Sequence, residues 1–267
     1  MPKRAECVDS YLICATPRTG SSLLLGLLES TGVAGHPQAY FRSPDEPLWV
    51  DRWQIRRTAE GDFDYVDYVR AALATGRTGN GVFGAKLMWG TLDEVVDKLA
   101  GTYPDLAGND IALLSRAFGR TRFVFLRRDD VVAQAVSWLR AEQTARWFVG
   151  GNGEIGGDAG NGQAPRFDPD GITHLVETIR EHNAAWESWF AAWGVQPLVV
   201  RYEELDTDMV AATRRVLDFL GLDLPEGGAI VARHQRQADD LNREWIRRYR
   251  EEAVRGGPPT PGPPTCR

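Results

Sequence analysis

The sequence of 267 residues contains few cysteines, only Cys7, Cys14 and Cys266, and their spacing does not suit a zinc site. An odd number of cysteines, without a recognisable signal peptide, predicts a reduced cytoplasmic protein rather than a disulfide framework. The sequence also lacks any apolar run near the ~20 residues that a membrane-spanning helix requires. We therefore expect a cytoplasmic protein without a membrane span.

An excess of positive charge is also absent, because the net charge is −6. This balance argues against a general nucleic-acid or membrane-surface binder, although local basic clusters can still hold a phosphorylated ligand. Hydrophobic residues make up 43% of the chain, enough for one substantial core. We expect one domain over residues 1–255, with a flexible Gly-rich loop at 150–171 that is either a mobile lid or a passive connection. A disordered Pro- and Gly-rich tail is expected at 256–267.

Short apolar runs alternate with longer amphipathic stretches. The apolar runs predict strands at Tyr11–Ala15, Val82–Met88, Arg122–Leu126 and Pro197–Arg201. Helices are expected at residues 21–30, 63–75, 92–101, 107–118, 130–147, 173–193, 207–220 and 241–253. Such alternation predicts an α/β, P-loop-like fold of three layers, with a largely parallel central sheet flanked by helices. In such folds the ligand lies at the carboxyl ends of the strands.

The first expected strand is followed by a tight loop, Thr16–Gly20, and then by the start of an apolar helix. The N–H groups of such a loop and helix converge, and the helix dipole favours an anion there. Arg18 adds a forked cation, and Ser21 and Ser22 add hydroxyl groups. Because the P-loop ending Gly-Lys-Ser/Thr is missing, a 5′-phosphate site is favoured over a nucleoside triphosphatase. An ordinary strand-to-helix turn is the alternative.

A second strand-to-helix junction also carries cations. Arg127 and Arg128 stand at the end of the strand, and Asp130 is a suitable N-cap for the next helix. Gln134 and Ser137 share one face of that helix, being three residues apart. Taken alone, this junction also fits a surface helix with a basic start.

Together the two junctions resemble the sulfotransferases that use 3′-phosphoadenosine 5′-phosphosulfate. Further blocks of sequence resemble one branch, the bacterial trehalose 2-sulfotransferase family, in the same order along the chain. They are Thr-Gly-Val-Ala-Gly-His-Pro-Gln at 31–38, Gly-Val-Phe-Gly-Ala-Lys-Leu-Met-Trp at 81–89, Gln-Ala-Val-Ser-Trp at 134–138, Arg-Ala-Glu-Gln-Thr at 140–144 and Arg-Gln-Ala-Asp at 236–239, followed by Glu244 and Trp245.

The resemblance implies roles for individual residues. The donor's 5′-phosphosulfate would be held by Arg18, Thr19, Gly20, Ser21 and Ser22. Its 3′-phosphate would be held by Arg128 and Ser137, with Arg127 a less certain neighbour and with Arg236 and Gln237 as C-terminal contacts. Lys86 would neutralise charge on the bridging oxygen as adenosine 3′,5′-bisphosphate leaves, with a solvated lysine as the alternative. No metal is required, because Arg18, Lys86 and Arg128 supply the cations.

The implied acceptor is trehalose or a similar small glycoside. Candidate contacts to it are Gln38, Tyr40, Trp53, Trp89, Gln143 and Trp147, with core or helix packing as the alternative for the aromatic residues and for Gln143. The sequence does not set the oligomeric state, and a homodimer is one option.

The base is missing from the implied site. In the family pattern a Glu in a Pro-Gln-Glu-aromatic segment takes the proton of the acceptor hydroxyl, but this chain has Ala39 there. Three explanations stay open. The first, which is favoured on chemical grounds, is a deliberate Glu-to-Ala change made to trap a substrate complex. The second is that another residue, such as His36 or Glu46, serves as the base. The third is that the protein binds its ligand without turnover. His36 is the poorer geometric substitute, because residues 36 and 39 face opposite sides of an extended segment unless Pro37 turns the chain.

Two other functions compete with a sulfotransferase. A nucleotide kinase-like phosphotransferase would need a P-loop lysine and magnesium ligands, and neither is evident. A catalytically silent protein that binds the desulfated nucleotide or a sulfated metabolite is kept open by Ala39.

Overall fold

The computed structural model describes residues 8–147, 164–232 and 240–255. Its strands are β1 (Ser10–Ala15), β2 (Phe83–Met88), β3 (Thr121–Arg127) and β4 (Leu198–Arg201). All pair in parallel, in the order β2-β1-β3-β4. Each strand lies within one residue of its expected bounds, so the α/β fold with a parallel sheet is confirmed.

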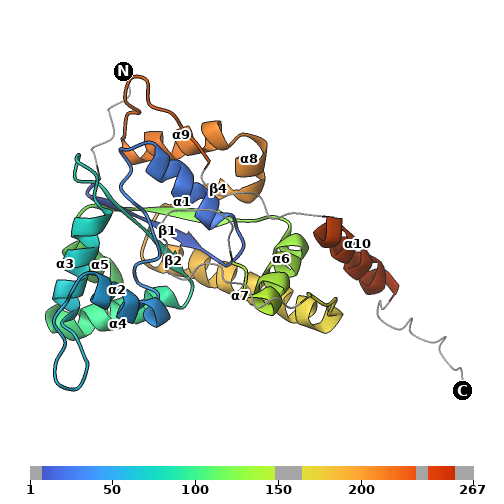
Figure 1. Ribbon diagram of the computed structural model, residues 1–267, viewed down its shortest axis with the longest axis horizontal. Helices are drawn as coiled ribbons and strands as arrows, with labels where there is room; N and C mark the ends of the chain where they lie inside the picture. Colours follow the sequence, from blue (N-terminus) through green and yellow to red (C-terminus); the bar gives the residue numbers. More distant parts are fainter. Residues whose placement is uncertain (1–7, 148–163, 233–239, 256–267) are drawn as a thin grey trace, which may run out of the picture.

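Helices cover both faces of this sheet (Figure 1). One face is covered by α1 (Ser21–Ser30), α8 (Tyr202–Thr207) and α9 (Met209–Leu220). The other is covered by α2 (Glu46–Arg52), α3 (Tyr65–Gly76), α4 (Thr91–Thr102), α5 (Asp110–Phe118) and α7 (Pro169–Ala192). Between them run two 3-10 turns, η1 (Ser43–Asp45) and η2 (Pro104–Leu106). The sequence patterns did not reveal α2, α8 or the two turns.

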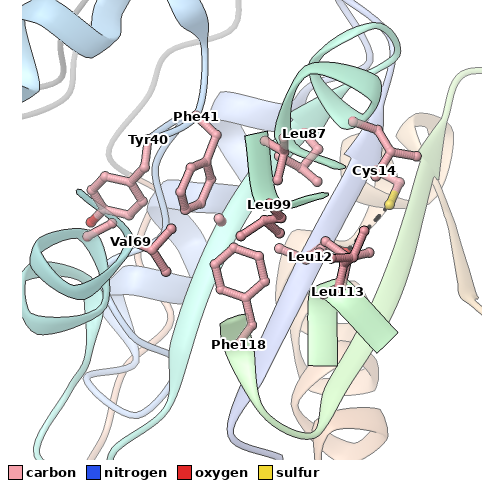
Figure 2. Packing of buried hydrophobic residues seen from close by; sticks show 14 of the residues in the cluster. Leu12, Cys14, Tyr40, Phe41, Val69, Leu87, Leu99, Leu113 and Phe118 are labelled. Atoms are coloured by element: carbon pink, nitrogen blue, oxygen red, sulfur yellow. Dashed lines mark hydrogen bonds between the residues drawn. The ribbon is translucent and has the colours of Figure 1, made fainter. Parts of the chain in front are cut away.

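Alternation along the strands divides the core between the two faces. Leu12 and Cys14 of β1 point toward α4, α5 and α7, whereas Tyr11 and Ile13 point toward α1 and α9. Figure 2 shows the first of these clusters, in which Leu12 and Cys14 lie with Phe118 and with side chains of the segment before α2. Burial raises the pKa of the Cys14 thiol, so this cysteine is a core residue rather than a nucleophile.

A third hydrophobic cluster joins α6 (Val131–Thr144) and α7 to α10 (Asp240–Arg255). α7 begins at Pro169, four residues before its expected start, because the Asp168 side chain accepts a hydrogen bond from the Gly171 N–H at 3.0 Å. The last residues of the expected 150–171 loop are therefore helical. The segment 148–163 and the tail 256–267 lie outside the described residues. No described helix combines the length and apolar character that crossing a bilayer requires.

Candidate active site

The loop after β1 stands at the carboxyl end of a central strand and leads directly into α1. Gly20, with φ of 82°, is the N-cap of α1 and has no side chain with which to cap it. The first N–H groups of α1 therefore point out of the helix end, where the dipole favours an anion. Tyr202 packs so closely on Gly20 that a Cβ atom there would lie 2.7 Å from the ring. Only glycine fits this position.

Arg18 connects the loop after β1 to helix α6. Its φ is 66°, and its Nε donates a hydrogen bond to Ser137 Oγ at 3.0 Å, across 119 residues of sequence. A terminal nitrogen of the same guanidinium donates to the Trp147 carbonyl. Two residues assigned from separate motifs are thus in direct contact.

Of the remaining residues, Thr19 shapes the loop, and Ser21 and Ser22 lie in the first turn of the helix that follows it. The Thr19 hydroxyl is fully buried and donates to the Thr16 carbonyl at 3.0 Å. The Thr19 hydroxyl therefore holds the turn of the loop and is not available to a nucleotide. Ser21 is buried and Ser22 half-buried in the first turn of α1.

Arg127 and Arg128 point in different directions. Arg127 is the last residue of β3 and turns toward α7, where a terminal nitrogen donates to Glu187 Oε1 at 2.9 Å. Arg128 lies over the Tyr202 ring, 4.3 Å from its centroid. The Arg127 guanidinium is therefore directed toward α7 and away from Arg128, and its ion pair with Glu187 does not support the assignment of Arg127 to the nucleotide.

Arg128 has the character of an anion ligand. It is half-buried, and burial lowers its pKa, although an arginine stays protonated at neutral pH. Its Nε is buried and has no hydrogen-bond partner in the described part of the chain. Buried donors without an acceptor are uncommon in proteins, and the Nε of Arg127 shares this state, so the Arg128 guanidinium has a donor that a ligand could use. The residue fits a bound phosphate.

The start of α6 is closed to such an anion. Glu203 accepts hydrogen bonds from the N–H groups of Asp129 and Asp130 at 3.2 and 3.3 Å. Asp130 caps the helix as expected, accepting from the Ala133 N–H at 3.0 Å. Because carboxylates already take these N–H groups, a phosphate here must be held by side chains.

Ala39 lies beside the β2 edge of the sheet. Gln38 forms a parallel bridge with Ala85, and its carbonyl accepts from the Lys86 N–H at 2.9 Å. Alternation of β2 places Lys86 on the same sheet face as α1, in register with Ile13. The base position and Lys86 are therefore close to one another, near the carboxyl end of the sheet.

Neither alternative base faces this site. The His36 ring lies 3.2 Å from Glu29 Oε1, in the last turn of α1. That turn is roughly 12 Å from the N-terminal end of the helix. Glu46 is buried, and both of its carboxylate oxygens accept from Lys98 Nζ, at 2.7 and 2.8 Å. Both side chains have other partners, and the expectation that either replaces the missing Glu is not supported.

The aromatic acceptor candidates are part of the core. Tyr40 is fully buried among the side chains of Figure 2, and its hydroxyl donates to the His36 carbonyl at 2.6 Å. Trp53 stacks on Trp49, with 4.9 Å between the ring centroids. Trp89 packs edge-on against a buried tryptophan of α7 at 5.1 Å. The assignment of Tyr40 to the acceptor is wrong, and the other rings are mainly engaged with neighbouring rings.

The polar candidates differ from one another. Gln143 uses both ends of its amide on the backbone of Arg166, at 3.0 and 2.7 Å, so it fastens a connecting segment to α6. Trp147 is 38% exposed. Gln38 keeps a buried side-chain oxygen for which the described residues provide no donor. Arg236 and Gln237 lie outside the described residues.

Three site residues were not assigned from sequence. Tyr202 contacts both Gly20 and Arg128, and Trp186 of α7 donates through its indole N–H to the Ala15 carbonyl at 3.1 Å. Gln134 binds the loop itself. Tyr202 follows β4 directly, so the rule that ligands gather at the carboxyl ends of parallel strands was the signal that could have found it.

Side chains that could bind a metal ion would have to cluster in space. In the described ranges, no three or more His, Cys, Asp or Glu side chains gather in a way that could hold a metal ion.

Comparison with known proteins identifies the family of this chain. A family model described as Stf0 sulphotransferase matches residues 10–252. The chain belongs to the Stf0 sulphotransferase family. That match covers every element from β1 to most of α10, so the family resemblance and the sulfotransferase class are confirmed.

Two relatives of this Stf0 chain are curated proteins of similar length, both called trehalose 2-sulfotransferase. The protein from Mycobacterium tuberculosis is 34% identical over 278 residues, covering 96% of this chain and 100% of the relative. The protein from Mycolicibacterium smegmatis is 34% identical over 272 residues, covering 94% and 97%. A crystal structure of sulfotransferase STF9 from Mycobacterium avium aligns with TM-score 0.45 and 12% identity, covering 95% of this chain and 70% of that one.

Proposed function

We propose that this chain binds 3′-phosphoadenosine 5′-phosphosulfate and transfers its sulfuryl group to a hydroxyl of trehalose or a similar small glycoside. The observation that carries the proposal is the contact between Arg18 and Ser137 at 3.0 Å, and the unpartnered Nε of Arg128 adds to it. A donor with anionic groups at both ends of its ribose needs two anion sites at a fixed separation. The chain supplies two such sites and joins them.

The loop would take the 5′ end of the donor. The open N-terminus of α1 and the Arg18 guanidinium would hold the phosphosulfate. Arg128 and Ser137 would hold the 3′-phosphate through side chains, because Glu203 already occupies the backbone at the start of α6. Lys86 would offset charge on the bridging oxygen as the sulfur–oxygen bond to phosphate breaks.

The acceptor is proposed from the two curated relatives, whose name states trehalose as the substrate. The acceptor oxygen attacks sulfur in line with the departing bisphosphate, and its proton must pass to a base. Position 39 would carry that base, since it lies beside Lys86. An alanine there cannot accept a proton, so we expect slow transfer by the chain as it stands.

Ala39 also favours a second function, in which the protein binds the nucleotide or a sulfated metabolite without turnover. The two functions share the nucleotide site and differ only in the transfer step. An intact donor site together with no transfer, even after a carboxylate is restored, would support the silent binder.

The test is transfer of labelled sulfate from the donor to trehalose by the chain and by Ala39→Glu. Other glycosides are offered in parallel, and ATP with magnesium serves as the control for phosphotransfer. We expect labelled sulfotrehalose from the Glu variant. Labelling of another glycoside in its place would keep the sulfotransferase and replace the acceptor. Phosphate transfer from ATP would overturn the proposal.

A further inference from the structure

A buried glutamine on α6 is hydrogen-bonded to the loop that follows β1. Gln134 is fully buried, and its Nε2 donates two hydrogen bonds, to Thr16 Oγ1 and to the Pro17 carbonyl, both at 2.7 Å. Because a proline carbonyl can only accept, the amide nitrogen must be the atom that faces the loop. Both protons of the amide are therefore used on consecutive residues of one loop.

The two acceptors immediately precede the residue that carries the charge. Arg18 follows Pro17 and has the uncommon left-handed φ of 66°. A non-glycine residue keeps such a conformation only where its neighbours fix it. Gln134 fixes the backbone on one side of Arg18, and the Ser137 hydroxyl, one turn further along the same helix face, receives the Arg18 side chain.

We propose that Gln134 is a positioning residue for the 5′ end of the donor. It acts through the loop: it sets where the Arg18 guanidinium and the α1 N-terminus stand relative to each other. The inference rests on the proposed donor site. It assigns to Gln134 no contact with the nucleotide, and it separates Gln134 from Arg128, which would act on the 3′-phosphate.

This role has a selective consequence. Removing the amide frees the loop but leaves Arg128 in place, so only ligands with a 5′-phosphate should lose affinity. Two neutral hydrogen bonds are lost, which corresponds to about a 10-fold weakening. A residue that merely supports the fold would weaken all nucleotides alike or none.

The experiment measures affinity by calorimetry for adenosine 3′,5′-bisphosphate and for adenosine 3′-monophosphate. It compares the unaltered chain with Gln134→Leu, which keeps the size of the side chain and removes the amide. We expect the bisphosphate to bind about 10-fold more weakly to the variant, while the 3′-monophosphate binds as before. Equal loss for both ligands, or no loss for either, would overturn the inference.

Two further variants keep the test decisive. Thr16→Val removes one of the two acceptors from the loop side, so a weaker loss with the same preference for the 5′-phosphate is expected even if Gln134→Leu does not fold. Asn183→Leu removes another buried amide, on α7, and should not change the ratio of the two affinities. Failure of the unaltered chain to bind the bisphosphate would instead reject the proposed function.

Discussion

The proposed donor side and the proposed acceptor side of this molecule use polar residues in opposite ways. On the donor side, residues more than 100 positions apart are joined by hydrogen bonds, as Arg18 is to Ser137 and Gln134 to Thr16. On the acceptor side, residues 38–53 pack as an extension of the core, with Tyr40 and Trp49 buried. Ala39 places a methyl group at the position that we propose for the base.

The difference teaches that residue type alone does not reveal a binding surface. Aromatic rings beside a motif look like a sugar-stacking wall, yet here they stack on each other. Arg18 and Ser137 belong to the segments that follow the neighbouring parallel strands β1 and β3, so the sheet brings these two segments to the same edge. The proposed donor site therefore follows from the fold, whereas the proposed acceptor site depends on details of packing.

The largest expected effect concerns the base. Ala39→Glu should raise sulfuryl transfer by on the order of 10²–10⁴, the usual contribution of a general base. Ala39→Gln has nearly the same shape without the basic oxygen pair and should give no gain. Single-turnover rates with bound donor measure this step alone. Equal rates for the Glu and Gln variants would show that position 39 does not carry the base.

The next effect separates two neighbouring arginines. Arg128→Met should weaken adenosine 3′,5′-bisphosphate binding by about 30-fold, because charge-assisted hydrogen bonds to phosphate are lost. Arg127→Met is the matched control, since its guanidinium pairs with Glu187 on the other sheet face. Calorimetric titration of both variants checks this. A comparable loss in Arg127→Met would contradict the orientation of the two side chains.

A third change tests the acceptor side through stability. Lys98→Met leaves the buried Glu46 carboxylate without its partner and should cost about 2 kcal/mol of unfolding free energy, less than a fully buried pair because Lys98 is partly exposed. Nucleotide affinity should not change. Denaturant unfolding with parallel calorimetry separates the two outcomes, and a loss of nucleotide affinity would show that the two sides are coupled.

The same variant has a pH dependence with a defined sign. Burial raises the pKa of Glu46, and Lys98 opposes that rise. Without Lys98 the folded-state pKa moves further above the unfolded value, so the folded protein keeps a proton that the unfolded chain has released. Its stability therefore increases as pH falls and decreases as pH rises through the folded pKa. The deficit of Lys98→Met should be larger at pH 8 than at pH 5.

The smallest expected effect is that of Tyr40→Phe. It removes one hydrogen bond to the His36 carbonyl and should cost about 1 kcal/mol of stability. The KM for trehalose, measured in the Ala39→Glu background, should stay the same. A several-fold rise in that KM would place Tyr40 at the acceptor after all.

The sheet and the positions of the two strand-to-helix junctions could be predicted from sequence because short-range patterns determine them. Buried apolar runs predicted strands β1 to β4, and the N-cap residue Asp130 predicted the start of α6. Strand alternation also predicts that the side chains of Arg127 and Arg128 point in opposite directions, since consecutive residues face opposite sides of a sheet.

The remaining assignments needed tertiary partners that lie far away in sequence. Gln143 is held by Arg166, and His36 turns toward Glu29. α2 has seven residues and α8 has six, too few to show helical periodicity. The Tyr40 ring is covered by the rings of Trp49 in α2, of Trp53 just after α2 and of Phe83 in β2. None of these facts is encoded in a local pattern.

The most direct test of the two-anion donor site is a pair of calorimetric titrations on the chain as printed, without magnesium. The ligands are adenosine 3′,5′-bisphosphate and adenosine 5′-monophosphate, which differ only in the 3′-phosphate. We expect the bisphosphate to bind at least about 30-fold more tightly, because Arg128 and Ser137 have no other anion to hold. Equal affinities, or binding of ATP that depends on magnesium, would contradict a donor site built from these two junctions.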